Sequence, residues 1–338
     1  MTTTPSTTPR AAVLTGLGTH VPSRVVTNHE LAQRIDTSDE WIRQRTGIRE
    51  RRTVEPGQVT SDLAVPAATA ALRSAGTDQV DAVVLATTTP DRLVPATAPT
   101  VAHRLGVGHA MAFDVNSACS GFIHALACGA GLIAAGTADS VLVIGADTIT
   151  TRIDPTDRAT VTLFGDGAGA VVLQAGGPDQ PGALGPFNLG SDGAFSSLIH
   201  VPGNHTASRR CGADDEEQFV VMDGKNAYRH AVARLTQSSA TALAAAGWTA
   251  KQLRCLVAHQ ANQRIIEAVA QRLDLPLEHC AINIGRLGNT VAASVPLALE
   301  HAARAGLISA NDKILLTAFG AGLSWGSTTL TWPDISIP

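Results

Sequence analysis

Hydrophobic and polar positions along the chain follow two patterns that take turns. Short apolar runs, typical of buried strands, are followed by longer stretches in which apolar residues recur every three or four positions, as in amphipathic helices. This order predicts an α/β fold, in which helices pack on the faces of sheets. The patterns predict strands at 80–86, 110–116, 141–146, 253–258, 280–284 and 313–319, and helices at 96–106, about 119–135, 225–246, 261–273 and 289 to about 304.

The predicted elements of the first half repeat in the second half. Cys119 lies 17 residues before Gly136 in one helical stretch. Asn289 lies 17 residues before Gly306 in another, and both stretches end in Ala-Gly. This self-similarity indicates a duplicated α/β unit with Cys119 and Asn289 at its two loop-to-helix junctions. The strands that correspond are 80–86 with 253–258, and 141–146 with 314–319.

Changes of composition divide the chain into segments. Residues 1–10 are rich in Thr and Pro and are expected to form a disordered tail, not a signal peptide. The two halves are expected at 11–175 and 221–338. Between them, 176–220 is rich in Gly, Pro and polar residues, which predicts a connection or surface excursion. No apolar run approaches the roughly 18 residues that span a bilayer, so we expect a cytoplasmic protein without a membrane partner.

Charge and cysteine content argue against several classes of protein. Lys and Arg total 25 against 29 for Asp and Glu, a net charge of −4 without a dominant basic stripe, so no nucleic-acid partner is expected. The cysteines lack the spacing of zinc sites or of a disulfide framework, so no metal is expected. They are Cys119, Cys128, Cys211, Cys255 and Cys280.

Cys119 stands where an apolar strand pattern ends in small residues and a helical pattern begins. A helix N-terminus carries unpaired N–H groups and partial positive charge, which favour thiolate over thiol. We therefore expect a lowered pKa and a nucleophilic role for Cys119. A buried structural cysteine is the alternative, because free cysteines are among the most buried residues.

Two sequence motifs resemble known sites but stand in the wrong context. The glycine-rich run 165–169 precedes a strand and opens no helix, unlike a dinucleotide fingerprint, so a tight turn with close backbone approach is expected. The G-x-S-x-G match at 322–326 is followed by a strand pattern, whereas a hydrolase nucleophile precedes a helix.

One dense basic cluster adjoins Trp41. A solvated helix end explains it as well as a site for phosphates or an acidic carrier does. Its members are Arg43, Arg45, Arg49, Arg51 and Arg52.

Three separated segments carry a family resemblance: DVNSACSGF at 114–122, AHQANQRII at 258–266 and GRLGNTVAASVP at 285–296. Together they resemble β-ketoacyl-[acyl carrier protein] synthase III, the initiation condensing enzyme of the thiolase fold, and the resemblance runs from about residue 11 to 332. It implies duplicated βαβαβαββ halves in a layered αβαβα arrangement, and a homodimer.

The resemblance implies that Cys119, His259 and Asn289 are catalytic. Cys119 would take the acyl group from an acyl-CoA as a thioester. His259 and Asn289 would donate hydrogen bonds to the malonyl thioester oxygen as CO2 leaves. The backbone N–H groups of Cys119 and Ala321 would form the oxyanion hole.

The resemblance also implies how substrates bind. CoA thioesters and phosphopantetheine carriers are expected as substrates, with no permanently bound cofactor. Trp41 and Arg158 would sandwich adenine, and Arg45 would meet the CoA phosphates. The remaining expected contacts are Gly224 along the pantetheine tunnel, Lys225 where the family often has Asn, and Arg264 toward the carrier.

Acyl-chain choice is expected to depend on five side chains. Val94 stands where an aromatic residue restricts some relatives to acetyl groups, and it would close the pocket across a dimer interface. Tyr228 takes a position that is Phe in the family. The expected pocket residues are Val94, Ile149, Phe164, Leu198 and Tyr228.

These implications favour decarboxylative condensation of an acyl-CoA starter with malonyl carrier protein, in fatty-acid or polyketide initiation. Relatives that transfer the acyl group to oxygen or nitrogen without condensation are a second hypothesis. A carrier-binding protein that has lost the chemistry is a third. The acyl starter and the pathway stay open.

Overall fold

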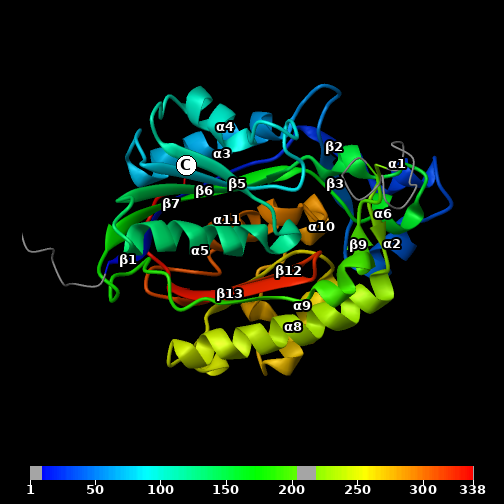
Figure 1. Cartoon of the computed structure of the whole chain (residues 1–338). Coiled ribbons are helices and arrows are strands. Elements are labelled where there is room, and N and C mark those ends of the chain that lie inside the picture. Colours follow the sequence, from blue (N-terminus) through cyan, green and yellow to red (C-terminus); the bar gives the residue numbers. More distant parts are fainter. Residues whose placement is uncertain (1–9, 204–217, 338) are drawn as a thin grey trace, which may run out of the picture.

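The computed structural model describes residues 10–203 and 218–337. Figure 1 shows five layers: helices, a sheet, two central helices, a second sheet and further helices. This αβαβα arrangement is the predicted thiolase-like fold. The tail expected at 1–10 lies outside the described residues except for Arg10, and 204–217 of the expected connection also lie outside them.

The first sheet has the strand order β1-β7-β6-β4-β5. β4 runs parallel to β5 and β6, whereas β7 runs antiparallel to β6 and β1. β4 and β6 are mostly apolar because they lie inside the sheet, where both faces are covered by helices. The bounds are β1 Ala11–His20, β4 Ala82–Ala86, β5 Met111–Val115, β6 Ser140–Asp147 and β7 Gly167–Gly176.

The second sheet has the order β11-β12-β13-β8. β11 and β12 are parallel, and β13 is antiparallel to its neighbours β12 and β8. β8 lies inside the stretch expected to be a connection, so that stretch contributes a strand to the second sheet. The bounds are β8 Asn188–Ser191, β11 Cys255–Ala258, β12 Lys313–Gly320 and β13 Ser324–Thr331.

Six longer helices cover the sheets within the described residues. α3 and α4 lie on the outer face of the first sheet and α8 and α9 on that of the second, with α5 and α11 between the sheets (Figure 1). Their bounds are α3 Thr60–Ala75, α4 Thr97–Leu105, α5 Gly121–Ala134, α8 Gly224–Ala245, α9 Gln263–Arg272 and α11 Ser294–Arg304.

Shorter elements gather at one end of the layers, on the right of Figure 1. Among them, Ser38 caps the first turn of α2, and Gly47, at φ 82°, ends that helix. The bounds are β2 Arg24–Thr27, α1 Asn28–Ala32, α2 Asp39–Thr46, β3 Glu50–Thr53, α6 Arg158–Val161, β9 Ile199–His200, β10 Val221–Met222 and α10 Ile284–Leu287.

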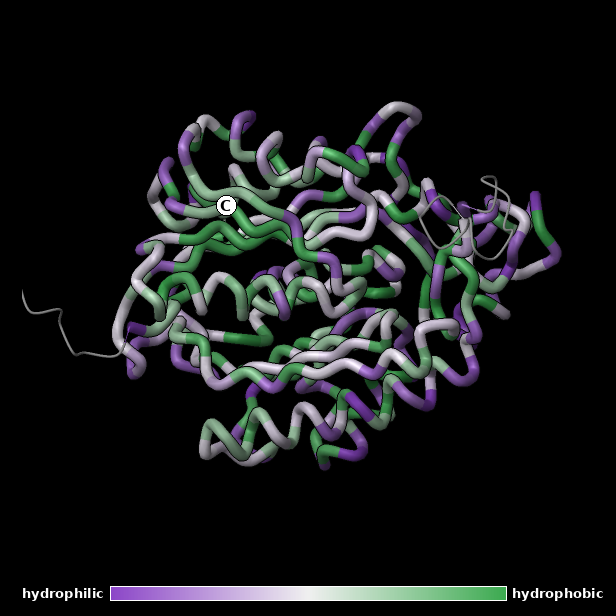
Figure 2. Tube along the Cα trace, viewed as in Figure 1, coloured by the Kyte–Doolittle hydropathy of each residue, from purple (hydrophilic) through white to green (hydrophobic). Residues whose placement is uncertain are grey.

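The main core lies between the two sheets, around α5 and α11. Figure 2 shows hydrophobic positions concentrated along the strands, with polar positions on the surface loops. Phe122 and Leu126 of α5 pack there with Leu299 of α11, each at most 1% exposed. A Cβ on Gly145 of β6 would lie 2.6 Å from the Ala292 carbonyl oxygen, so a glycine is needed for this close approach.

The positions of the elements show the duplication, but the two halves align with a different offset from the expected one. β4 and β11 begin 173 positions apart, at 82 and 255, as do β6 and β12, at 140 and 313. A 3-10 turn precedes each central helix, and its first residue has positive φ: 46° at Ala118 and 50° at Val291. Cys119 therefore corresponds to Ala292. The predicted pairing of Cys119 with Asn289 is wrong because α11 is three residues shorter than α5, which are 11 and 14 residues long.

The strand expected at 280–284 does not form. Only Cys280 makes an isolated parallel bridge, to Leu256, and α10 begins at Ile284. The expected division into 11–175, 176–220 and 221–338 stays a prediction.

Candidate active site

Cys119 lies in the 3-10 turn Ala118–Ser120 that leads into α5. It is half-buried and packs against a cluster that includes Ile149, Phe164 and Val291. The cluster gives the side chain an apolar surrounding, and Cys119 stands two positions before the first residue of the buried helix α5.

The lowered pKa expected for Cys119 is wrong for the free thiol. Burial and, to a smaller extent, the nearby Asp147 carboxylate raise the pKa of Cys119 to about 12. A helix N-terminus stabilises a thiolate only modestly, whereas removing an ion from water costs several kcal/mol. Cys119 is therefore a thiol at rest, and its proton has to leave as the sulfur attacks.

The Cys119 amide is open to a substrate. Its neighbours are occupied: the Ala118 N–H donates to Asn116 Oδ1 at 3.3 Å, and the Ser120 N–H to the Ser117 carbonyl at 3.1 Å. The Cys119 N–H has no acceptor in another described residue, and it interacts with its own sulfur, whose pKa it lowers. This is what an oxyanion hole requires.

Gly320, the last residue of β12, makes room beside this amide. A Cβ at this position would lie 2.6 Å from the Cys119 nitrogen, a distance that real side chains do not tolerate. Ala321, the second expected donor, follows directly. The Ser324 hydroxyl lies 2.8 Å from that of Ser120 and donates to the Ala321 carbonyl at 2.9 Å. Ser324 thus connects the two segments that carry the expected donors.

His259 follows β11 directly and is 2% exposed. Burial lowers its pKa to about 3, so the imidazole is neutral at physiological pH. Nδ1 lies 2.5 Å from the Ser294 hydroxyl, whereas Nε2 is buried without a partner among the described residues. One ring nitrogen is fixed and the other is available.

Asn289 is oriented by its own loop. Its Oδ1 accepts the Val291 N–H at 3.0 Å, which identifies the other amide atom as Nδ2. Its backbone N–H donates to the Leu163 carbonyl at 2.8 Å. The Nδ2 donor has no acceptor among the described residues and stays free for a ligand.

Three contacts bring these segments together. Asn289 forms an isolated bridge with Phe164, which packs in the same cluster as Cys119. Ser294, at the start of α11, contacts His259. The structure therefore brings the nucleophile and two neutral N–H donors together near the N-terminal ends of α5 and α11.

The expected acyl pocket is partly supported. Ile149 and Phe164 pack in the Cys119 cluster, whereas Leu198 and Tyr228 pack against a different core beside α8 and α9. Ile199, one position beyond Leu198 and the first residue of β9, joins the Cys119 cluster instead. Val94 packs in neither cluster.

Val94 lies in the loop before α4 and is 81% exposed, next to Leu93 at 91%. Within one chain it does not reach the Cys119 cluster. Its expected role depends on a second chain.

Trp41 and its arginines form a surface stack. The Arg158 guanidinium lies 4.6 Å from the Trp41 ring centroid, and that of Arg45 lies 5.5 Å from it. An adenine between Trp41 and Arg158 needs about twice a van der Waals separation, so Arg158 has to move aside. An exposed cation–π contact is worth about 0.5–1 kcal/mol, so this exchange costs little.

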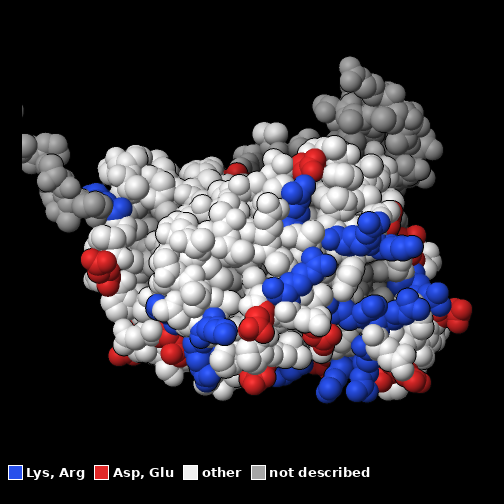
Figure 3. Space-filling model, turned by 90° about the horizontal axis from the view of Figure 1, so that it is seen from below, with Lys and Arg blue, Asp and Glu red and all other residues white. Residues whose placement is uncertain are grey.

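The other expected carrier contacts are exposed near the starts of α8 and α9. Arg264 lies over the Tyr228 ring at 5.9 Å, while Gly224 and Lys225 open α8. Figure 3, seen from the α8 and α9 face, shows Lys and Arg gathered toward the end that carries α2. The exposed basic residues of α2, α6, α8 and α9 are Arg43, Arg45, Arg158, Lys225, Arg229, Arg264 and Arg272.

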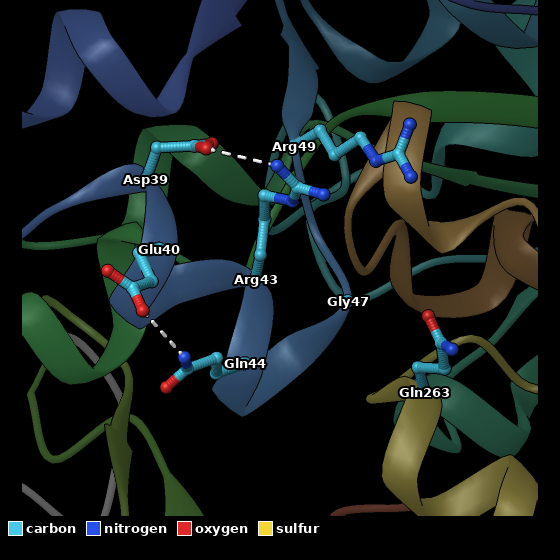
Figure 4. Close-up of a pocket in the computed structure, with 7 residues that line it drawn as sticks. All are labelled: Asp39, Glu40, Arg43, Gln44, Gly47, Arg49 and Gln263. Atoms are coloured by element: carbon cyan, nitrogen blue, oxygen red, sulfur yellow. Dashed lines mark hydrogen bonds and ion pairs between the residues drawn. The ribbon is translucent and has the colours of Figure 1, made fainter.

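A surface cleft of about 460 Å³ lies between α2 and α9. Figure 4 shows Arg43 paired with Asp39, and Glu40 bonded to Gln44, on one wall, with Gln263 on the other. Its charges are largely paired within α2, and Cys119 does not line it. It adjoins the Trp41 stack but is not the reaction site.

Sequence reasoning missed Gly320, Ser294 and Asp147. Asp147 is fully buried and accepts hydrogen bonds from Thr88 at 2.7 Å and from the Ala292 N–H at 3.1 Å. A glycine ending an apolar strand and a serine in the first turn of a helix are weak signals on their own. Their importance depends on contacts between the two halves.

Among the described residues, no helix has both the length and the apolar character needed to cross a membrane.

Known proteins of one family are similar to this chain over nearly its whole length. A family model described as 3-oxoacyl-[acyl-carrier-protein] synthase III matches residues 113–193, and the model of its C-terminal part matches 243–332. A β-ketoacyl-[acyl-carrier-protein] synthase III of Streptomyces coelicolor is 53% identical over 330 residues, covering 96% of this chain and 98% of the relative.

Solved structures agree. The 3-oxoacyl-(acyl carrier protein) synthase III of Pseudomonas aeruginosa superposes with a TM-score of 0.92 at 50% identity, covering 97% of this chain and 100% of that one. The priming β-ketosynthase of the R1128 polyketide pathway gives 0.91 at 37% identity, with 100% of both chains covered. The chain therefore belongs to the 3-oxoacyl-[acyl-carrier-protein] synthase III family of condensing acyltransferases.

Proposed function

We propose that this protein condenses an acyl-CoA with malonyl-[acyl carrier protein], releasing CO2 and forming 3-oxoacyl-[acyl carrier protein]. The observation that carries the proposal is the pairing of a cysteine beside an open backbone amide with two neutral, unpartnered N–H donors. The cysteine and the open amide can hold an acyl group as a thioester. The two N–H donors can stabilise the negative charge of an enolate oxygen.

In the first half-reaction, the Cys119 sulfur attacks the acyl-CoA carbonyl. The new C–S bond forms as the bond to CoA breaks, and the cysteine proton ends on the departing CoA thiol. The N–H groups of Cys119 and Ala321 stabilise the tetrahedral oxyanion. One thioester replaces another, so the exchange is nearly isoenergetic.

In the second half-reaction, the malonyl carboxylate leaves as CO2 and its bonding electrons form an enolate on the thioester. His259 Nε2–H and Asn289 Nδ2–H donate to the enolate oxygen. The enolate carbon attacks the acyl-Cys119 carbonyl, the C–S bond breaks, and the thiolate regains a proton from water.

Transfer of the acyl group to an oxygen or nitrogen acceptor fits less well. That reaction forms no enolate, so the buried donors of His259 and Asn289 would have no transition-state charge to stabilise. Loss of all chemistry fits less well again, because Cys119 and both donors are present.

Substrate binding uses no permanently bound cofactor in this proposal. Trp41 and Arg158 hold the adenine of CoA, and Arg45 meets its phosphates. Lys225 and Arg264, with Gly224 at the start of α8, receive the phosphopantetheine of an acidic carrier. Ile149 and Phe164 line the acyl pocket, and Val94 of a second copy closes it.

A homodimer is supported by an unpaired sheet edge. β5 ends the first sheet, and its first residue, Met111, is 38% exposed. Leu93 and Val94 add exposed apolar surface in the loop before the neighbouring helix α4. Edge strands with such surface tend to pair with another chain. We place the enzyme in the cytoplasm, in fatty-acid or polyketide initiation.

A reconstituted assay tests the proposal. The protein is mixed with a panel of acyl-CoAs and malonyl-[acyl carrier protein], and carrier products are identified by intact mass. A 3-oxoacyl carrier with matching CO2 release is expected, and Asn289→Ala should reduce it by about 100-fold or more. Acylation of Cys119 without any 3-oxoacyl product from any starter would contradict condensation.

A further inference from the structure

The proton of neutral His259 can sit on either ring nitrogen, and the choice decides what the residue can do. With the proton on Nε2, the unpartnered nitrogen is a hydrogen-bond donor. With the proton on Nδ1, Nε2 presents a lone pair. A lone pair facing a developing enolate oxygen would repel it, so one tautomer helps the reaction and the other opposes it.

Ser294 contacts the nitrogen that does not face substrate. Its hydroxyl oxygen lies 2.5 Å from His259 Nδ1, and the residue is 1% exposed. A hydroxyl carries one hydrogen and accepts others through its lone pairs. The direction of this hydrogen bond therefore sets the tautomer.

A second contact occupies one of the two lone pairs of the Ser294 oxygen. The backbone N–H of Gln260 donates to the Ser294 oxygen at 3.3 Å, and an amide cannot reverse its role. The Ser294 hydroxyl has no other acceptor among the described residues. The hydroxyl therefore donates its hydrogen to Nδ1. Because Nδ1 accepts, the ring proton resides on Nε2.

The amide that starts this chain is itself held. The Gln260 side chain donates to the carbonyls of Ala258 at 2.7 Å and Ala281 at 3.0 Å. Its Oε1 accepts the Asn283 N–H at 3.1 Å. Gln260 is 1% exposed, and these three hydrogen bonds hold its side chain in place.

We propose that Ser294 is a positioning residue that holds His259 as its Nε2–H tautomer, through the relay Gln260 N–H to Ser294 O–H to His259 Nδ1. Ser294 touches no substrate and acts through His259. The kinetic consequence rests on the proposed function, because it assigns Nε2–H to the enolate oxygen. The tautomer itself does not depend on that function.

The position of Ser294 supports this role. It is the first residue of α11, one position after the N-cap Ala293. Here neither Ser294 nor the cap residue Ala293 makes a side-chain cap. Instead, the Ser294 hydroxyl bonds His259, the residue that follows β11, and so links α11 to that strand.

The test compares Ser294→Ala with Ser294→Thr, which keeps the hydroxyl. Ser239→Ala is the matched control, because Ser239 is a fully buried helix serine whose hydroxyl has no partner among the described residues. The tautomer is measured by ¹⁵N NMR of histidine-labelled protein, with His259 assigned by its loss in His259→Gln. Acylation of Cys119 and decarboxylation of malonyl carrier are measured separately.

We expect a protonated Nε2 and an unprotonated Nδ1 for His259 in the wild type and in Ser294→Thr, and a mixture in Ser294→Ala. Decarboxylation should fall about tenfold or more in Ser294→Ala, with acylation within about twofold and Ser239→Ala like the wild type. A wild-type spectrum with the proton on Nδ1 overturns the proposal, even if Ser294→Ala fails to fold. Equal decarboxylation in Ser294→Ala and Ser239→Ala also overturns it. A wild type with the Nε2–H spectrum but no decarboxylation contradicts the proposed function and not the tautomer.

Discussion

Asp147 and Gly320 occupy corresponding positions in the two halves and leave equivalent backbone amides in opposite states. They end β6 and β12, at 147 and 320, with the same spacing of 173 as the strands themselves. The Asp147 carboxylate accepts the Ala292 N–H at 3.1 Å. Gly320 presents no side chain to the corresponding Cys119 amide. The duplicated fold thus fills one amide with a carboxylate and keeps the other open for a substrate oxyanion.

Gly320→Ala should therefore abolish most acylation of Cys119. The added Cβ would lie 2.6 Å from the Cys119 nitrogen and 3.0 Å from that of Ser120, so backbone has to move. We expect a loss of about 100-fold or more in the acylation rate, measured by intact mass against time. Gly131→Ala is the control, because a Cβ there meets nothing within 4 Å. Unchanged acylation in Gly320→Ala would show that the Cys119 amide is not an oxyanion donor.

Alkylation of Cys119 should rise with pH across the range 7–10 without a plateau. The thiol pKa is raised to about 12, so the thiolate fraction grows about tenfold per pH unit below that value. The rate is followed with iodoacetamide and peptide mass spectrometry. A plateau below pH 8 would contradict the raised pKa.

Asp147→Asn should speed this alkylation at any fixed pH between 7 and 10. Burial raises the pKa of Asp147 to about 6, so its carboxylate is charged there and opposes a thiolate at Cys119. Removing the charge should lower the Cys119 pKa and increase the rate roughly two- to tenfold, with burial keeping that pKa above its ordinary value. Asp166→Asn is the control, since Asp166 is equally buried but bonds Val54 and Thr150. Equal rates in both variants would remove Asp147 as a cause.

The long elements of the fold were predictable because each combines a sustained apolar pattern with a clear end. β6 and α5 are examples: an unbroken apolar run forms the first, and small residues ending at Gly136, at φ 69°, follow the second. The strand predicted at 280–284 was wrong. Cys280 is buried like a strand residue, but it makes only one isolated bridge and no continuous ladder. Local pattern carries no information on the partner that completes a sheet.

The catalytic trio was predictable only through family resemblance. Nothing local distinguishes His259 from the other histidines. The contact that orients His259 comes from Ser294, 35 positions away, and the space at the Cys119 amide depends on the close approach of Gly320. Such contacts depend on how two sheets and two central helices meet, which periodicity does not encode.

Trp41→Ala should raise KM for acyl-CoA and leave kcat nearly unchanged. Stacking of a base on an aromatic ring is worth about 1–3 kcal/mol, so an increase of about tenfold is expected. Arg43→Ala is the control, because Arg43 lies on the same helix but pairs with Asp39 in the cleft of Figure 4. An equal change of KM in both variants would contradict a specific adenine stack.

Charges on the free edge of the first sheet should separate a dimer. The double variant Met111→Lys with Leu93→Glu places charges where we propose the second copy binds. Sedimentation velocity should show weakening of association by about 100-fold or more, since uncompensated interface charges cost several kcal/mol. Leu277→Glu, at another exposed apolar position, should sediment like the wild type. A wild-type protein that sediments as a monomer at micromolar concentration would contradict the proposed dimer.

The most direct test follows one labelled acyl group through the reaction. The protein is loaded with ¹³C-labelled acyl-CoA, freed of excess CoA, and then given unlabelled malonyl-[acyl carrier protein], with intact masses of enzyme and carrier read over time. We predict a label on Cys119 that disappears as a labelled 3-oxoacyl carrier forms, with one CO2 released for each, and no label in Cys119→Ala. A labelled 3-oxoacyl carrier from Cys119→Ala, or a label that leaves Cys119 without entering a 3-oxoacyl carrier, would contradict condensation through Cys119.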